Sequence, residues 1–120
     1  YNQALLIVLS TLGLKPGDEV IASPVSCLAS NQPFVIKGLK VIWADVNPLS
    51  WTLSVDDVRS KITSKTKAIF HNHYCGYLGE IEEMKKPIAG QHDVDVKGEI
   101  GSRCNKWETD IPHSDGIYVL

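Results

Sequence analysis

The sequence has little of several features that mark whole classes of protein. Twelve basic and fourteen acidic residues give a formal net charge of −2, and no Lys/Arg cluster suggests a face for nucleic acid. The longest apolar run, Ala4 to Leu9, is far shorter than the roughly 20 residues of a membrane-spanning helix. A basic leader with a small-residue cleavage site is also missing. We therefore expect a soluble globular domain with no membrane or nucleic-acid partner.

Cysteine is scarce and is not arranged in pairs. The three cysteines, Cys27, Cys75 and Cys104, are widely spaced and odd in number, which favours free thiols in a reducing compartment over a disulfide framework. The expected location is the cytoplasm. The chain also starts at Tyr1 with an apolar stretch that reads as the middle of a helix, so we expect its N-terminal end to have been removed.

Hydrophobic periodicity and turn residues predict helices that alternate with short strands. Ser26 is the expected N-cap of the second helix, and Ser54 with Asp57 resembles a capping box at the start of the third. The expected helices cover 3–12, about 27–37, 55–62 and 80–91, and the expected strands cover 19–22, 40–46 and 66–73, with a fourth strand beginning at 94–96. This alternation is typical of an α/β fold with a mostly parallel sheet flanked by helices.

Three loops should meet at one edge of such a sheet. They follow the three expected strands and cover residues 23–30, 45–51 and 71–79. Ligands of open α/β sheets gather outside the carboxyl ends of the strands. The sequence therefore predicts a binding site at this edge.

The segment HNHYCG, residues 71–76, places His71, His73 and Cys75 at alternate positions. These side chains could bind zinc and serve a small metal-dependent hydrolase. A structural zinc usually needs four ligands, and no CxxC or other paired motif supplies the fourth; His92 and Cys104 are isolated. We favour the interpretation of polar residues that end a strand above a pocket, with no metal.

Other reactive or aromatic side chains have simple structural interpretations. Cys27 could be a nucleophile, but a structural thiol at the start of a helix is the favoured reading. Asp45 could bind a ligand or cap the turn that follows it. Trp43 and Trp51 are expected to pack in the core and under a loop, and Asp57 is expected on a solvated helix face.

An ordered set of segments is similar to a known family. LGLKPGDEVIASP, VIWADVNP and SKITSKTKAIFHNHYCGYLGEIEEM resemble the DegT/DnrJ/StrS family of sugar aminotransferases. Its members are pyridoxal-phosphate (PLP) enzymes with the fold of aspartate aminotransferase, fold type I. The similarity runs from residue 1 to about Met84. It implies that this chain is a partial large domain of that fold.

The resemblance also implies cofactor-binding positions. The family places a phosphate-binding loop just before the first helix, and Tyr1, Asn2 and Gln3 fall at the end of that loop. Cys27 stands where many members carry an aromatic ring that stacks on the pyridine. His73 and Gly76 take the places of a His and a Gly near the cofactor and the subunit interface.

The similarity decays after Met84. Family members carry a Glu-Asp pair whose Asp contacts the pyridine nitrogen, and Gly98-Glu99 falls about there, so Glu99 is the expected substitute. Residues 1–97 are expected to form the partial large domain. Residues 98–120 are expected to be a divergent or irregular tail, and a misread coding frame would explain them.

The lysine that holds the cofactor covalently lies further along the chain in the family. Five lysines of this chain do not match its setting: Lys61, Lys65, Lys67, Lys85 and Lys86. We therefore assign no catalytic residue and expect the chain on its own to be inactive.

For the whole enzyme, the resemblance implies transfer of an amino group from an amino acid, glutamate in the first place, to a keto-sugar nucleotide. It also implies a homodimer when the chain is full length. Two alternatives stay open: a cytoplasmic α/β ligand-binding module, and the metal-dependent hydrolase built on His71, His73 and Cys75.

Overall fold

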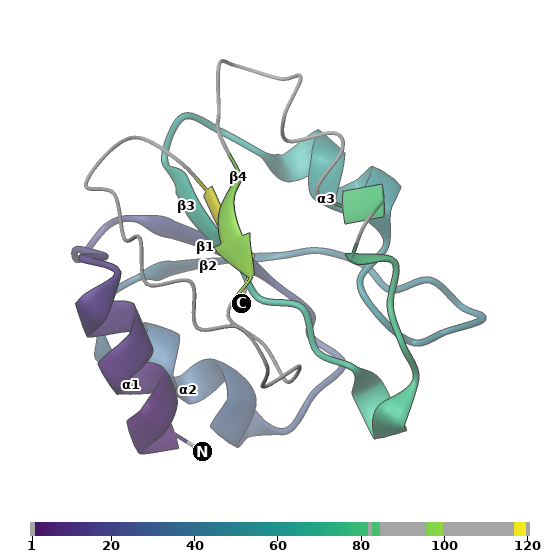
Figure 1. The fold of residues 1–120 in the computed structure, drawn as a ribbon, viewed down its shortest axis with the longest axis horizontal. Coiled ribbons are helices and arrows are strands. Elements are labelled where there is room, and N and C mark those ends of the chain that lie inside the picture. Colours follow the sequence, from purple (N-terminus) through teal and green to yellow (C-terminus); the bar gives the residue numbers. More distant parts are fainter. Residues whose placement is uncertain (1, 82, 85–95, 100–116, 120) are drawn as a thin grey trace.

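The computed structural model describes residues 2–81, 83–84, 96–99 and 117–119 (Figure 1). The elements follow one another in alternation over the first seventy residues. They are α1 (Asn2–Thr11), β1 (Glu19–Ala22), α2 (Leu28–Ile36), β2 (Lys40–Trp43), α3 (Val55–Lys61), β3 (Thr66–Ile69), the 3-10 turn η1 (Tyr74–Gly76), β4 (Val96–Glu99) and β5 (Ile117–Val119). The predicted α/β class is confirmed.

The described strands form one parallel sheet in the order β2-β1-β3-β5-β4. Glu19 of β1 lies opposite Lys40 of β2, and Ile21 lies opposite Ile69 of β3. β1 therefore runs between two neighbours, and all four of its residues are buried. A strand covered on both faces must be apolar on both, which is why VIA forms a continuous run here instead of alternating with polar residues.

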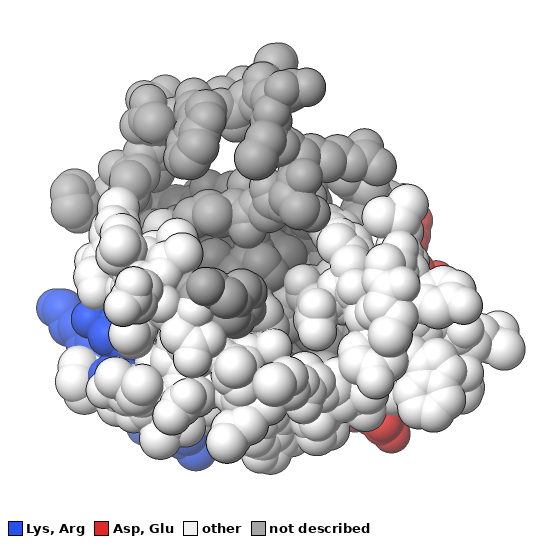
Figure 2. Space-filling view, turned by 90° about the horizontal axis from the view of Figure 1, so that it is seen from below, with Lys and Arg blue, Asp and Glu red and all other residues white. Residues whose placement is uncertain are grey.

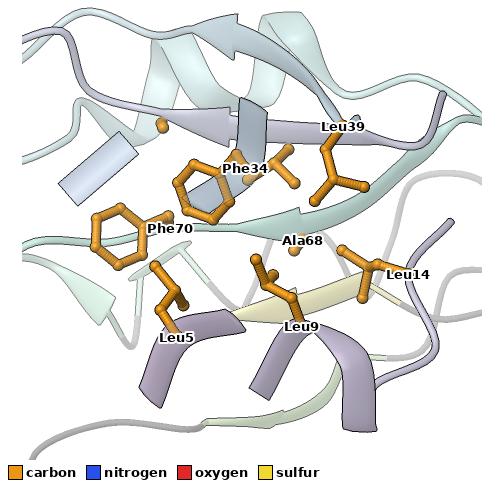
Figure 3. Packing of buried hydrophobic residues seen from close by; sticks show 9 residues of the cluster. Leu5, Leu9, Leu14, Phe34, Leu39, Ala68 and Phe70 are labelled. Atoms are coloured by element: carbon orange, nitrogen blue, oxygen red, sulfur yellow. The ribbon is translucent and has the colours of Figure 1, made fainter. Parts of the chain in front are cut away.

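Two hydrophobic clusters lie on opposite faces of the sheet. Val20 and Ala22 point toward α1 and α2, and Ile21 points to the side of α3, as the alternation of a strand requires (Figure 1). The larger cluster joins both helices to the sheet (Figure 3). Its members are Leu5, Leu9, Leu14, Val20, Ala22, Phe34, Leu39, Ala68 and Phe70.

The first of these clusters includes one aromatic pair. The rings of Phe34 and Phe70 meet edge to face with centroids 5.3 Å apart (Figure 3). Such a pair adds about 0.5–1.5 kcal/mol to the burial of the two rings. This contact fixes α2 against the residue that follows β3, close to the edge where the site was predicted.

Both strands that precede the predicted site are shorter than expected. β2 ends at Trp43 instead of residue 46, because the N–H of Asp45 donates to the side chain of Asp57 and not to a neighbouring strand. β3 ends at Ile69 instead of residue 73, although the N–H of Phe70 still donates to Ile21. The polar residues 71–73 therefore belong to the loop and not to the strand.

Of the two N-caps that were predicted from the sequence, one is confirmed and the other is wrong. Ser54 is the N-cap of α3, and its Oγ accepts from the N–H of Asp57, as predicted. Ser26 is not the N-cap of α2; Cys27 takes that position without a side-chain cap. The prediction was wrong because the Ser26 hydroxyl instead accepts a hydrogen bond from Asn31 Nδ2 at 2.9 Å.

The structure describes only part of the C-terminal segment for which a helix, a strand and an irregular tail were expected. Residues 81, 83 and 84 are helical, and the rest of the expected helix at 80–91 lies outside the described residues apart from residue 80, which precedes the helix. A fourth strand was expected to begin at 94–96, and β4 begins at Val96. Within the tail expected to be irregular, Ile117–Val119 forms β5 and pairs with β3 and β4.

The opposite, amino-terminal edge of the sheet buries one carboxylate. The side chain of Glu19, 6% exposed, pairs with Lys40 Nζ at 3.0 Å and accepts from Thr63 Oγ1 at 2.5 Å. The hydrogen bond from Thr63 and the bond from Lys40 lower the pKa of this carboxyl below its ordinary value. Glu19 thus joins β1, β2 and the turn before β3.

We expect Glu19→Gln to lower the free energy of unfolding by about 1–3 kcal/mol, because the buried carboxylate accepts stronger hydrogen bonds from Lys40 and Thr63 than a neutral amide would. Urea unfolding of the chain measures this. The exposed Asp56, changed to Asn, is the matched control and should stay within about 0.5 kcal/mol of the parent. Equal effects of the two substitutions would contradict the role given to Glu19.

Acid should remove the contribution of Glu19. Because its folded pKa is below the unfolded value, the stabilisation is complete above about pH 4.5 and is lost as the pH falls through the folded pKa. We expect the difference in urea midpoint between the parent and Glu19→Gln to shrink below about pH 4.5. A difference that is constant from neutral to acid pH would contradict this.

Candidate functional site at the carboxyl edge of the sheet

The described part of the candidate site lies where the strands end. A helix that precedes or follows a parallel strand through a short connection runs opposite to it, so the N-termini of α1 and α2 lie at the carboxyl edge of the sheet. The loops after β2 and β3 reach the same edge. Neither helix carries an acidic residue in its first turn, so both N-termini keep the partial positive charge of their free N–H groups.

Charge is distributed unevenly around the molecule. Figure 2 shows, from below the view of Figure 1, basic side chains at the border nearer α1 and α2 and acidic side chains at the border nearer α3. The described surface between these borders is formed by residues without charge. An anion bound on that described surface would depend on backbone N–H groups more than on Lys or Arg.

The start of α1 lies beside α2. Asn2 Nδ2 is 3.5 Å from Gln32 Oε1, Gln3 is exposed, and Tyr1 lies outside the described residues. Cys27 is exposed at the N-cap of α2. The structure thus brings the first turn of α1 beside the second turn of α2, with Asn2 and Cys27 at the same edge of the sheet.

The two histidines of the loop after β3 contact each other and the far end of the same loop, at Gly79. His71 is buried, and its ring meets that of His73 edge to face at 5.3 Å. The N–H of Gly79 donates to His73 Nδ1 at 3.2 Å. A Cβ added at Gly79 would overlap the ring of His71. Gly79 is therefore held between two rings, one that packs on it and one that accepts from it.

Residues 71–76 do not form a metal-binding cluster with other side chains in the described part of the chain. Within it, no three His, Cys, Asp or Glu side chains lie close enough to hold a metal ion, and His71, His73 and Cys75 do not form such a group. Cys75 is exposed on η1 with a left-handed backbone, φ 51°. His92 and Cys104 lie outside the described residues.

Glu99 is the last residue of β4, which is the outermost strand of the described sheet on that side. Its backbone lies opposite Val119 of β5, and β5 separates β4 from β3. Glu99 is thus at the carboxyl end of its strand. The strand between it and His73 was not predicted.

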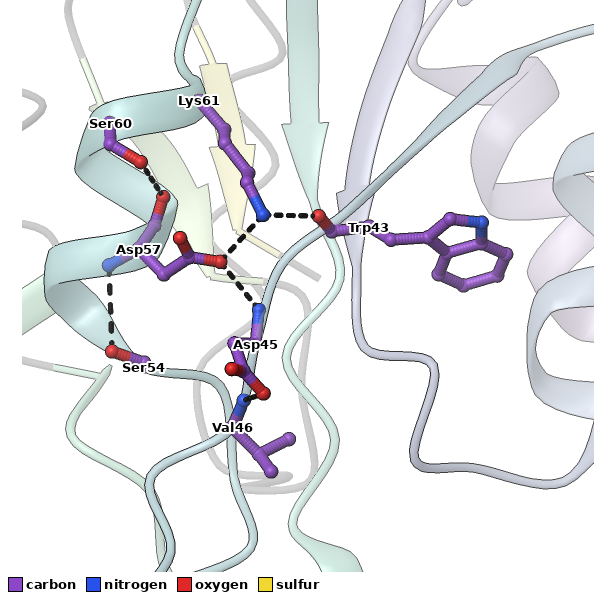
Figure 4. A network of polar contacts seen from close by, with 7 residues as sticks. All are labelled: Trp43, Asp45, Val46, Ser54, Asp57, Ser60 and Lys61. Atoms are coloured by element: carbon purple, nitrogen blue, oxygen red, sulfur yellow. Dashed lines mark hydrogen bonds and ion pairs between the residues drawn. The ribbon is translucent and has the colours of Figure 1, made fainter.

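A polar network anchors the loop after β2 (Figure 4). The carboxylate of Asp57 accepts from the N–H of Asp45 at 2.6 Å and pairs with Lys61 Nζ at 2.7 Å; Lys61 also donates to the carbonyl of Trp43 at 2.7 Å. The bond from the Asp45 N–H and the bond from Lys61 lower the pKa of Asp57. The expected solvated Asp57 is therefore wrong. The i, i+4 spacing of Asp57 and Lys61 was the signal that could have revealed the pair.

The aromatic residues near this loop are exposed. Trp43 and Trp51 keep 47% and 53% of their surface accessible, so the expected packing of Trp43 in the core is wrong. Asp45 Oδ1 accepts from the N–H of Val46 at 2.8 Å, and Asn47 Oδ1 accepts from the N–H of Leu49 at 2.9 Å. The turn at 47–50 is thus capped by Asn47 and not by Asp45.

The sequence analysis did not identify the buried polar residue Asn31. Asn31 Nδ2 donates to the carbonyl of Ser23 at 3.2 Å and to Ser26 Oγ, tying the end of β1 to α2. Its Oδ1 is buried and accepts no hydrogen bond from the residues that the structure describes. An Asn in the first turn of a helix is common on the surface, so the sequence gave no signal of its burial.

Three lysine side chains in the described part of the chain already have hydrogen-bond partners. Lys37 and Lys40 contact Ser10 and Glu19, and Lys61 is held by Asp57 and Trp43. Lys67 is the second residue of β3, and Lys65 precedes that strand. Lys85 and Lys86 lie outside the described residues. No described helix is long and apolar enough to cross a membrane.

We expect Gly79→Ala to cost about 1–3 kcal/mol of stability, because the new methyl group must displace the buried His71 ring. In a His71→Ala background the same change should cost much less, since the ring is gone. Urea unfolding of the four proteins of this cycle measures the coupling. Equal costs in both backgrounds would show that the ring and the glycine do not interact.

Three comparisons place these features among known proteins. The model of the DegT/DnrJ/EryC1/StrS aminotransferase family matches residues 2–97. GDP-perosamine synthase of Escherichia coli O157:H7 is 37% identical over 81 residues, which are 68% of this chain and 22% of that protein. The chain thus spans less than a third of the length of the curated relatives reported for it.

Two solved structures share the fold. The structure of ntda from Bacillus subtilis, with the cofactor PMP bound, matches this chain with a TM-score of 0.69 and 32% identity. The match covers 71% of this chain and 20% of the ntda chain. GDP-4-keto-6-deoxymannose-3-dehydratase, with a trapped PLP-glutamate geminal diamine, has a TM-score of 0.70 and 26% identity and covers 79% and 26% of the two chains. The predicted fold type I architecture is confirmed.

Proposed function

The chain belongs to the DegT/DnrJ/EryC1/StrS aminotransferase family, and from this membership we propose that it is part of a PLP-dependent sugar aminotransferase. The whole enzyme moves an amino group from glutamate to the keto group of a nucleotide-linked sugar. It works in the cytoplasm as a homodimer. The 120 residues on their own do not carry out the reaction.

Family membership carries the proposal, and two relatives support its finer parts. The E. coli relative is named for a GDP-linked amino sugar. The dehydratase is named for a GDP-linked keto-sugar and was trapped with PLP and glutamate. These names favour a nucleotide-linked keto-sugar as acceptor and glutamate as donor.

The described residues fit one part of the cofactor. The free N–H groups at the start of α1, with Asn2 and Gln3, suit its phosphate. Cys27 and His73, at the same edge of the sheet, would contact the ring, and Glu99 would contact the pyridine nitrogen from the end of β4. When bound, the protonated ring of PLP withdraws electrons from the bond that breaks at the amino-acid carbon.

The group that would hold the cofactor covalently is missing from this set. Lys61, the described lysine whose ammonium lies near the end of β2, is already held by Asp57 and by the carbonyl of Trp43. We therefore propose that the lysine belongs to a part of the enzyme beyond residue 120. Residues 1–97 then form the partial large domain, and residues 98–120 are a divergent tail or the product of a misread frame.

A related reaction is the second candidate. The solved neighbour that was trapped with PLP and glutamate is named a dehydratase. The same fold and donor can thus serve removal of a hydroxyl group from the sugar as well as amination. The two candidates share the cofactor site and differ in the product.

The test compares the 120-residue chain with the protein encoded by the complete coding region. Each is incubated with PLP, reduced with borohydride and analysed by mass spectrometry, and each is assayed with glutamate and a GDP-linked 4-keto-sugar. We expect the complete protein to be labelled at a lysine beyond residue 120 and to form 2-oxoglutarate and an amino sugar. The 120-residue chain should do neither.

Two results would contradict the proposal. One is a labelled lysine together with turnover in the 120-residue chain. The other is a complete coding region that ends at residue 120 with no further lysine. A complete protein that is labelled and consumes glutamate but yields a deoxysugar instead of an amino sugar would select the dehydratase reaction.

A further inference from the structure

The loop from His71 to Gly79 determines which ring nitrogen of His73 carries the hydrogen when the imidazole is neutral. A neutral imidazole carries one N–H and one bare nitrogen, and only the bare nitrogen accepts a hydrogen bond. His73 Nδ1 accepts from the backbone N–H of Gly79 at 3.2 Å. The hydrogen of neutral His73 must therefore be on Nε2.

The other ring nitrogen has no competing partner. The hydrogen bond recorded for the half-buried His73 uses Nδ1, and Nε2 makes none to any residue that the structure describes. His73 lies in the loop after β3, at the edge where the cofactor residues are proposed. Nε2 is thus a donor that can still bind a ligand.

The hydrogen bond from the Gly79 N–H to His73 Nδ1, which we call the clasp, can form only if residue 79 is glycine. Cys75 and Gly76 both have left-handed backbones, φ 51° and 83°, and these two residues turn the chain back toward His73. At its end, Gly79 packs against the buried ring of His71, where any Cβ would overlap that ring. A larger residue at 79 would push its own N–H away from His73.

We propose that Gly79 is a positioning residue that fixes His73 as an Nε2–H donor for an oxygen atom of the bound ligand. His71 is the wall that keeps Gly79 in place. The identity of the ligand rests on the proposed function, in which it is the pyridoxal phosphate or the substrate on it. The hydrogen bond between Gly79 and His73 does not depend on that assignment.

Two substitutions at one position separate the two nitrogens. In His73→Asn the amide oxygen can occupy the place of Nδ1 and accept from Gly79, but nothing replaces Nε2. In His73→Gln the amide reaches the place of Nε2, but Nδ1 is lost. Both variants are neutral and polar, so they serve as controls for each other.

The first readout is amide hydrogen exchange in the ligand-free chain. We expect the Gly79 amide to exchange about tenfold more slowly in the parent and in His73→Asn than in His73→Gln. The amide of Phe70, bonded to Ile21, is the control for folding and should stay protected in all three proteins. A Gly79 amide that exchanges as fast in the parent as in His73→Gln overturns the clasp.

The second readout is the nitrogen spectrum of the His73 ring, recorded well above the ordinary histidine pKa of about 6.5. Long-range proton–nitrogen correlations should place the hydrogen on Nε2, and a hydrogen on Nδ1 overturns the proposal. Addition of pyridoxal 5′-phosphate should shift Nε2 while Gly79 stays protected. An unshifted Nε2 rejects His73 as a ligand donor and also weakens the proposed cofactor site, whereas an unprotected Gly79 rejects the clasp alone.

Discussion

The parallel pairing of β1 with both neighbours is the constraint on which the rest of the structure depends. A central parallel strand needs crossover helices and apolar contacts on both faces, and the two clusters around Val20 and Ile21 provide them. The same pairing collects three loops at one edge of the sheet, because parallel strands all end on the same side. The position of the candidate site is therefore a consequence of the sheet topology and does not depend on any individual side chain.

At each of the two edges of the sheet, a carboxylate accepts hydrogen bonds from backbone or side-chain donors that take no part in strand pairing. Glu19 joins three segments at the amino-terminal edge, and Asp57 accepts the N–H of Asp45 where β2 stops. Each carboxylate has a lowered pKa because hydrogen bonds favour its charged form. The amino-terminal edge is thus held by a charged residue of β1 itself, and the end of β2 is held by a charged residue of α3.

This explains how far the sequence could predict the structure. The apolar run of β1, the Ser54 cap and the alternation of helices and strands follow from local patterns, and all of them were predicted. The end of β2, the buried Asn31 and the grip of His71 on Gly79 depend on residues that are distant in sequence or on shapes that no local pattern encodes. Ser26 was misplaced as a cap for the same reason, since its hydroxyl has a better partner in Asn31.

The proposed chemistry takes place at the carboxyl edge of the sheet, and the opposite edge has a purely structural role. The most direct test is a crystal structure of the complete protein with pyridoxal phosphate bound. We expect the phosphate at the first turn of α1 and the ring between the segments that begin at Cys27 and His73. A cofactor bound at the opposite edge, beside Glu19 and Lys40, would contradict the account.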